Sequence, residues 1–149
     1  EFLKTRTRRF TDLQSIKYAD DLERILQTGI VEGKTVAEIS GEFKKLMGWE
    51  KEGYRATRIA RTEVISVSNQ ARHDSYIEAG VPKKSWSSAR TGDLREEHLA
   101  YDFVTSAEPI PISEEFEVVP GVVGGPANTG QADHDINCRC TERPERDDE

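Results

Sequence analysis

The chain has 149 residues, of which 33% are charged and 35% hydrophobic, a balance that predicts one modest core beneath a largely polar surface. Its net charge of −7 argues against nucleic acid binding by the whole chain, because neutralising phosphates requires a basic surface. No stretch approaches the ~18 consecutive apolar residues of a membrane span, and the first residues lack the apolar stretch of a signal peptide.

The charge is distributed unevenly along the chain. The first ten residues are basic through Lys4, Arg6, Arg8 and Arg9, whereas residues 143–149 form an acidic tail. The basic end predicts weak contact with DNA in an otherwise acidic protein. The alternative is that both ends are simply solvated and mobile.

Two amphipathic helices are predicted first in the chain. Apolar residues recur at helical spacing over 12–28, and Gly29 would end that helix. A second helix would begin after Thr35, with Glu38 completing a capping box, and would end at Gly48. Because the connection between them is short, the two helices are expected to form a hairpin.

A longer helix is predicted over 53–79, ending at Gly80 before Pro82. Its apolar stripe is rich in small residues, which allow another backbone to approach closely. We therefore expect this helix to be the central one, on which other elements pack.

The pattern changes after Pro82. Alternation around Trp86 predicts a strand, and Asp93 is a plausible cap for a short helix through Leu99 or Ala100. Residues 103–136 lose helical periodicity and are rich in proline and glycine, which indicates a long irregular segment.

Short strands are expected near 116–119 and again at 136–141. The expected fold class is therefore α+β: an N-terminal helical hairpin, a long central helix, then a short helix and a small irregular β-sheet.

Several motifs stand in an order typical of one protein family. They are Ala60-Arg61-Thr62-Glu63, Asn69, Ala79-Gly80, Trp86, Asp93-x-Arg95-x-x-His98, Phe116 and Asn137-Cys138-Arg139-Cys140. In this combination the chain resembles the phage Mu F-like head-morphogenesis family of minor head proteins. The resemblance covers roughly residues 53–142, which gives three expected parts: a helical arm at 1–52, the family domain at 53–142 and an acidic tail at 143–149.

The resemblance implies a minor capsid protein, present in few copies inside the phage head near the portal vertex. Such a protein is assembled in the host cytoplasm, acts in head morphogenesis, and in some family members influences genome packaging or ejection. Its expected partners are portal or capsid proteins, with no membrane and no small-molecule substrate, and it is not expected to be an enzyme.

The two cysteines suggest a metal site. Some relatives in the family carry a cysteine pair near the position of His98, a pattern that looks like a four-ligand site. In this chain the corresponding ligands would be His98, His134, Cys138 and Cys140, which suit tetrahedral structural zinc. The alternative is that both cysteines are reduced, buried packing residues and that His98 makes an ordinary hydrogen bond.

Charged residues of the long helix suggest a structural polar network with the segment after the strand. The predicted members are Arg58, Arg61, Glu63, Asp93 and Arg95. Arginine–carboxylate pairs have specific geometry, so such a network would fix one packing arrangement.

Two other functions remain as alternatives. An enzyme or toxin-like domain would use His98 with nearby carboxylates, such as Glu96 and Glu97, although no nucleophile–base pair or phosphate-binding glycine loop accompanies them. A nucleic-acid binding module is the other alternative.

Three further residues carry expectations about their surroundings. His73 is expected to be a solvated surface group, and both tryptophans are expected in a core or a subunit contact.

Overall fold

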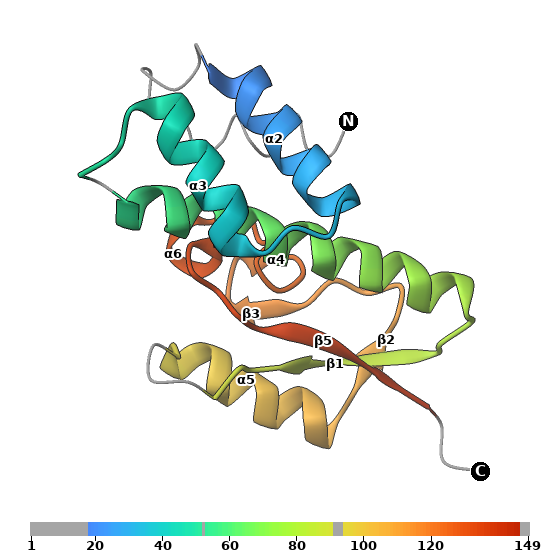
Figure 1. Ribbon diagram of the computed structural model, residues 1–149. Helices are drawn as coiled ribbons and strands as arrows, with labels where there is room; N and C mark the ends of the chain where they lie inside the picture. Colours follow the sequence, from blue (N-terminus) through green and yellow to red (C-terminus); the bar gives the residue numbers. More distant parts are fainter. Residues whose placement is uncertain (1–17, 52, 91–93, 147–149) are drawn as a thin grey trace. The chain divides into compact units, whose positions relative to one another are not determined.

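The computed structural model describes residues 18–51, 53–90 and 94–146, and within them the fold is α+β as expected (Figure 1). The basic residues at the N-terminus and Asp93 lie outside the described residues. The chain divides into two compact units between Val67 and Ser68. This division falls inside one long helix, so each unit contains part of it.

The first unit is helical. It contains α2 (Ala19–Val31), α3 (Val36–Met47) and the first part of α4 (Gly53–Glu78). An apolar cluster from these helices forms its core, with Trp49 packed against it; the buried members are Leu22, Ile25, Leu26, Ile39, Phe43, Ala56 and Ala60. The small residues of α4 thus lie in a packed interface, as the stripe predicted.

Helix α3 begins and ends where its sequence predicts. The hydroxyl of Thr35 accepts a hydrogen bond from Glu38 N at 3.3 Å, and the Glu38 carboxylate accepts one from Thr35 N at 2.7 Å. These two bonds make the capping box. At the other end Gly48 adopts a left-handed conformation with φ 65°, which glycine tolerates without strain.

The prediction that Gly29 ends the first helix is wrong, because α2 continues to Val31 and Gly33 supplies the left-handed residue after it. A Cβ at Gly29 would lie only 2.7 Å from a side-chain carbon of Ile39. Gly29 therefore allows α2 and α3 to pack closely, a role that one helix read alone does not reveal.

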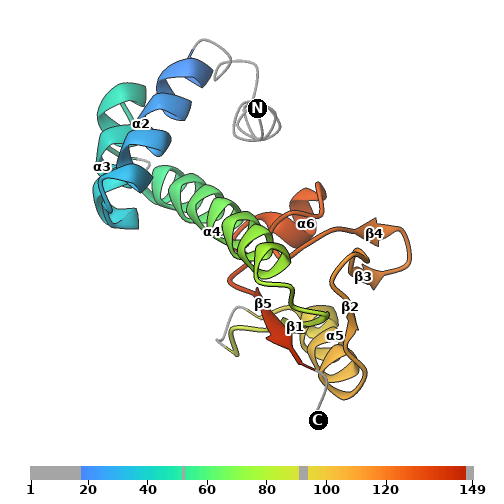
Figure 2. The same cartoon turned by 90° about the vertical axis from the view of Figure 1, so that its right-hand side faces the viewer.

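The second unit is built around a three-stranded antiparallel sheet in the order β2-β1-β5, and helix α5 packs against the central strand (Figures 1 and 2). The elements after α4 are β1 (Lys83–Ser87), α5 (Glu96–Ala107), β2 (Ile110–Pro111), β3 (Glu117–Val119), β4 (Val122–Val123), α6 (Ala132–Asp135) and β5 (Thr141–Glu145). Strands β3 and β4 form a separate two-stranded sheet.

Trp86 of β1 is the centre of the second core. Its side chain is fully buried and meets the rings of His98, Tyr101 and Phe116 edge-on, at centroid distances of 5.2, 5.9 and 5.5 Å. Edge-to-face aromatic contacts of this kind add to the stabilisation from burial alone. Since His98 and Tyr101 belong to α5, this contact fixes α5 on the strand.

Three expectations for this half need correction. Helix α5 runs to Ala107 rather than ending near Ala100. Strand β5 begins at Thr141, so the Asn-Cys-Arg-Cys segment precedes the strand instead of forming it. Part of the expected tail also lies in β5, where Pro144 is tolerated because the strand is at the edge of the sheet.

The described helices include none that combines the length and the apolar character needed to cross a membrane.

Candidate metal centre

The residues of the candidate site come from two segments of the second unit. His98 lies in the first turn of α5, and Cys138 and Cys140 lie between α6 and β5. The turn before the cysteines is sharp, with Asn137 at φ 57°, a left-handed conformation that asparagine adopts more readily than most residues.

Asp135 holds the loop that leads into this turn. Its buried carboxylate accepts hydrogen bonds from Thr129 N and Thr129 Oγ1 at 2.8 Å each and from Gly130 N at 2.8 Å. A buried carboxylate bonded to backbone donors in this way is costly to disturb. The path of the chain into the cysteine segment is therefore fixed by specific bonds.

Asn69 fixes the end of the cysteine segment. Its buried amide nitrogen donates hydrogen bonds at 2.9 Å to the carbonyls of Pro126 and Cys140, and its amide oxygen accepts one from Arg72 at 3.1 Å. One α4 side chain thereby holds two loop positions that lie 57 and 71 residues further along the chain.

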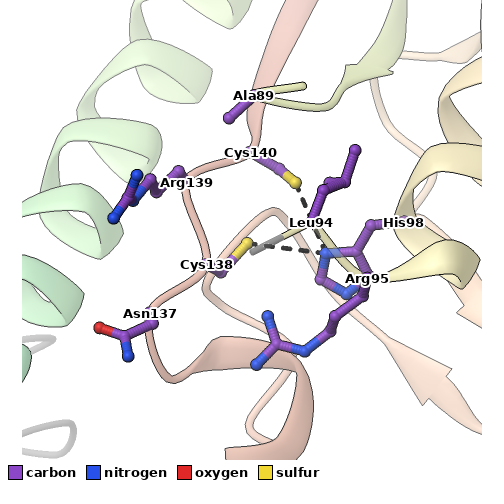
Figure 3. Close-up of a pocket in the computed structure, with 8 residues that line it drawn as sticks. All are labelled: Ala89, Leu94, Arg95, His98, Asn137, Cys138, Arg139 and Cys140. Carbon is purple, nitrogen blue, oxygen red and sulfur yellow. Dashed lines mark hydrogen bonds between the residues drawn. The ribbon is translucent and has the colours of Figure 1, made fainter. Parts of the chain in front are cut away.

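His98, Cys138 and Cys140 converge in the interior, and we call them the thiol–imidazole cluster (Figure 3). The Nδ1 atom of His98 lies 3.5 Å from the Cys140 sulfur and 3.8 Å from the Cys138 sulfur. All three side chains are at most 2% exposed, and both cysteines are free thiols. Three of the four predicted zinc ligands are thus brought together.

His134, the fourth predicted ligand, lies on the other side of the His98 ring. Its Nδ1 is 3.1 Å from His98 Nε2, and the two rings stack with centroids 5.4 Å apart. The Nε2 atom of His98 is on the opposite edge of the imidazole from the nitrogen that faces the sulfurs. The structure therefore groups three of the four predicted ligands and places His134 against His98 instead, and the four-residue ligand set stays a prediction.

The two thiols are unequal. The pKa of Cys140 is lowered to about 7, chiefly by a hydrogen bond with Cys138, and burial opposes this lowering. The pKa of Cys138 is raised, first by the same hydrogen bond and then by burial. Cys140 is therefore the thiol that ionises first, as a metal ligand must.

A small pocket reaches the cluster (Figure 3). Besides the three cluster residues it is lined by Ala89, Leu94, Arg95, Asn137 and Arg139. The three residues of the cluster therefore contact one another and also line the pocket.

The predicted polar network remains a prediction. Arg58 is exposed, Arg61 is half-buried and Glu63 is buried in the first unit, whereas Asp93 lies outside the described residues. Arg95, in the second unit, donates a hydrogen bond at 2.8 Å to the carbonyl of Ile136.

The expectation that His73 is a solvated surface group is wrong. Its Nδ1 lies 3.0 Å from a carboxylate oxygen of Glu142, whose side chain is only 3% exposed. Asn69 and His73 are four residues apart on α4, so they lie on one face of the helix and contact successive parts of the segment 140–142.

Other polar residues of the second unit were missed from the sequence. Asp102 accepts hydrogen bonds from Ser88 N, Ser88 Oγ and Ser106 Oγ at 3.0, 2.6 and 3.0 Å. Asp102 lies four residues after His98 and therefore on the same face of α5, and this spacing was the sequence signal that Asp102 would be buried against β1.

Comparison with known proteins identifies the family. The family described as "Phage Mu protein F like protein" matches residues 20–143, most of the chain. The chain therefore belongs to the phage Mu protein F like family. The matched range begins well before residue 53, so it includes α2 and α3, which the sequence resemblance places in a separate arm.

Three relatives extend this comparison. An Enterococcus faecalis protein named NAD(+)--arginine ADP-ribosyltransferase EFV is 33% identical over 84% of this chain and 26% of its own length. An uncharacterised Bacillus subtilis protein, YqbB, is 28% identical over 80% of this chain and 38% of its own. An uncharacterised Haemophilus influenzae protein is 26% identical over 86% of this chain and 25% of its own.

The chain thus spans between a quarter and two fifths of these relatives. No solved structure matches it.

Proposed function

We propose that this chain acts in phage head morphogenesis as part of a minor head protein inside the head, near the portal vertex. The observation that carries the proposal is the family match over residues 20–143, which includes nearly all of the described helices and strands. In this proposal its partners are portal or capsid proteins, and loss of the protein impairs genome packaging or ejection.

The organisation of the buried polar groups supports a scaffolding role. In the second unit Asn69 and Asp102 each bond to backbone or hydroxyl groups of other segments, and Asp135 bonds to residues of the loop just before it. Both nitrogens of His98 face other side chains in the interior, namely the two thiols and His134. This arrangement suits a rigid assembly component better than the acid–base role considered for His98, which requires contact with a substrate.

The direct test is a particle analysis in a phage or prophage that encodes this chain. We expect mass spectrometry of purified heads to detect the protein in few copies, and cross-linking to join it to the portal or a capsid protein. Deletion of its gene should lower the yield of DNA-filled, infectious particles while the major capsid protein is still made. Normal infectivity without the protein, or its absence from purified heads, would contradict the proposal.

A second candidate comes from the Enterococcus faecalis relative, whose name gives it NAD(+)–arginine ADP-ribosyltransferase activity. This chain covers 26% of that relative, so most of the relative lies outside the match. Incubation of the purified chain with labelled NAD+ and an arginine-containing acceptor tests the transfer directly. The head-assembly proposal expects no labelled acceptor, and labelling that exceeds a protein-free control would favour the enzyme.

A nucleic-acid role can be separated in the same preparation. Weak DNA contact through the basic N-terminus predicts binding that disappears when residues 1–10 are removed. Binding that survives this truncation and falls steeply with salt would favour a nucleic-acid module instead.

A further inference from the structure

The donor atoms of the thiol–imidazole cluster have the spacing of a tetrahedral zinc site. Zinc–sulfur and zinc–nitrogen bonds of ordinary length, at the tetrahedral angle, place the sulfur and nitrogen atoms about 3.6 Å apart. The observed separations from His98 Nδ1 are 3.5 and 3.8 Å, and all three donor atoms lie within 4.8 Å of one another. A zinc ion would therefore fit with little movement of the side chains.

The chemistry of these donors also selects the metal. Thiolate sulfur and imidazole nitrogen suit zinc, whereas magnesium and calcium prefer oxygen ligands. All three residues are buried, so a bound ion would lie beneath the protein surface.

His134 has the position of a residue that orients a metal ligand. A histidine that binds metal through one ring nitrogen usually donates the N–H of the other nitrogen to a nearby acceptor, which fixes its tautomer and orientation. Here His98 Nδ1 faces the two sulfurs (Figure 3). On the other edge of the ring, His98 Nε2 lies 3.1 Å from His134 Nδ1. A proton on His98 Nε2, donated to His134, leaves Nδ1 with a free lone pair toward the cluster.

We propose that His98, Cys138 and Cys140 bind one zinc ion, that His134 positions His98 without touching the ion, and that solvent takes the fourth coordination position. The solvent molecule at the fourth position would occupy the pocket beside the cluster, which is lined by Ala89, Leu94 and Arg95 together with the three donor residues. The site joins the start of α5 to the segment before β5, about 40 residues apart, and it is independent of the role in head assembly.

Metal content is the first test. The full chain, purified under reducing conditions, is stripped with a chelator and titrated with zinc chloride in competition with a chromophoric zinc indicator. We expect one equivalent of zinc per chain, both in the titration and by elemental analysis. Zinc well below one equivalent after reconstitution of a folded chain would overturn the site, while leaving the head-assembly proposal intact.

Variants separate the two histidines. His98→Ala and Cys140→Ser should lose zinc binding, whereas His134→Ala should keep one equivalent with affinity lowered about 10–100-fold, as is typical when a residue that orients a ligand is removed. His73→Ala is the matched control, because it removes the third histidine of the chain from outside the cluster. A loss of stoichiometry in His134→Ala equal to that in His98→Ala would make His134 a ligand and overturn the arrangement.

Cobalt substitution tests the site without depending on the folding of a variant. Cobalt(II) bound to the wild-type chain should give thiolate charge-transfer absorption and the intense visible bands of tetrahedral coordination. Added azide should shift the visible bands, because it replaces solvent at the fourth position. Absent charge-transfer bands would overturn the thiolate ligands, and visible bands that azide leaves unchanged would overturn the solvent-occupied position.

Discussion

The two units of the chain are stabilised in different ways. The first unit has an apolar core of leucine, isoleucine, phenylalanine and alanine side chains from three helices. The second buries an aromatic centre and also polar side chains with particular partners, such as Asn69, Asp102 and Asp135. Apolar packing tolerates changes of partner, whereas a buried polar group without its partner is costly. The second unit should therefore be the one that responds to isosteric polar substitutions, pH and metal.

The chain offers one reporter for each unit. Trp49 packs against the first core, and Trp86 is the centre of the second. Because the chain has two tryptophans, Trp86→Phe leaves Trp49 as the fluorescent reporter of the first unit, and Trp49→Phe leaves Trp86 as that of the second. Denaturant titrations of these backgrounds measure the two units separately.

The largest expected effect is in the first unit. Phe43→Ala should lower its free energy of unfolding by about 3–5 kcal/mol, because the buried ring is replaced by a cavity. The fluorescence midpoint of Trp49 measures the change. Tyr54→Ala is the matched control, since this aromatic residue of the first unit is 65% exposed and should change stability by less than about 1 kcal/mol. Equal effects of the two substitutions would contradict the assignment of the core.

The next effect should appear in the second unit. Asn69→Asp keeps the shape of the side chain but replaces a donor by a carboxylate oxygen that faces the carbonyls of Pro126 and Cys140. We expect a loss of about 1–3 kcal/mol, read from the Trp86 midpoint. Gln70→Glu makes the same chemical change on the next residue, whose amide bonds to an exposed partner, and should cost less than about 0.5 kcal/mol. If the Asn69→Asp variant is as stable as the Gln70→Glu control, the hydrogen bonds of Asn69 do not stabilise the second unit as described.

A pH dependence should distinguish the second unit as well. Burial alone would raise the pKa of Asp102, but the hydrogen bonds from Ser88 and Ser106 lower it below the ordinary value. A lowered carboxyl pKa contributes stability above the unfolded value of about 3.9, and this contribution is lost as the pH falls through the folded value. The stability advantage of wild type over Asp102→Asn should thus be about 1–3 kcal/mol at neutral pH and shrink in acid.

Acid denaturation curves followed by Trp86 measure this dependence. Glu108→Gln is the control, because Glu108 is exposed, and its curve should follow that of wild type. If the difference in unfolding free energy between wild type and Asp102→Asn stays constant down to pH about 3, the pKa of Asp102 is not lowered as described.

The smallest effects come from two glycines in the first unit. Gly29→Ala would place a methyl group 2.7 Å from Ile39 and should cost about 1 kcal/mol through overpacking. Gly41→Ala meets nothing within 4 Å in α3 and should stabilise the unit by about 0.5 kcal/mol, because it restricts the unfolded chain. The two substitutions should therefore change the free energy of unfolding of the first unit in opposite directions, as measured by the Trp49 midpoint. A stabilising Gly29→Ala would show that α2 and α3 do not pack as described.

The elements that depend on local chemistry were predictable. Thr35 and Glu38 mark the start of α3 because the capping box joins residues three apart, and the apolar stripe of α4 predicts its length closely. Gly29 was misread because helix packing, not helix ending, explains it. Where β5 begins depends on pairing with β1, more than 50 residues earlier, which no local pattern records.

The candidate site was predictable in its residue types but not in their arrangement. The sequence identifies His98, Cys138 and Cys140 because these side chains are the usual zinc ligands. It could not tell that His134 would lie on the far nitrogen of the His98 ring, because that depends on the short helix α6 and the turn at Asn137. Asn69 was visible as one residue of a motif, whereas its two carbonyl partners come from segments far along the chain.

Hydrogen exchange with and without zinc tests the comparison of the two units most directly. The zinc-loaded chain and the chelator-treated chain are compared peptide by peptide under reducing conditions. Zinc removal should increase exchange in α5 and in residues 136–145, while α2 and α3 keep their protection. Unchanged exchange in the second unit, or an equal loss of protection in α2 and α3, would contradict the account.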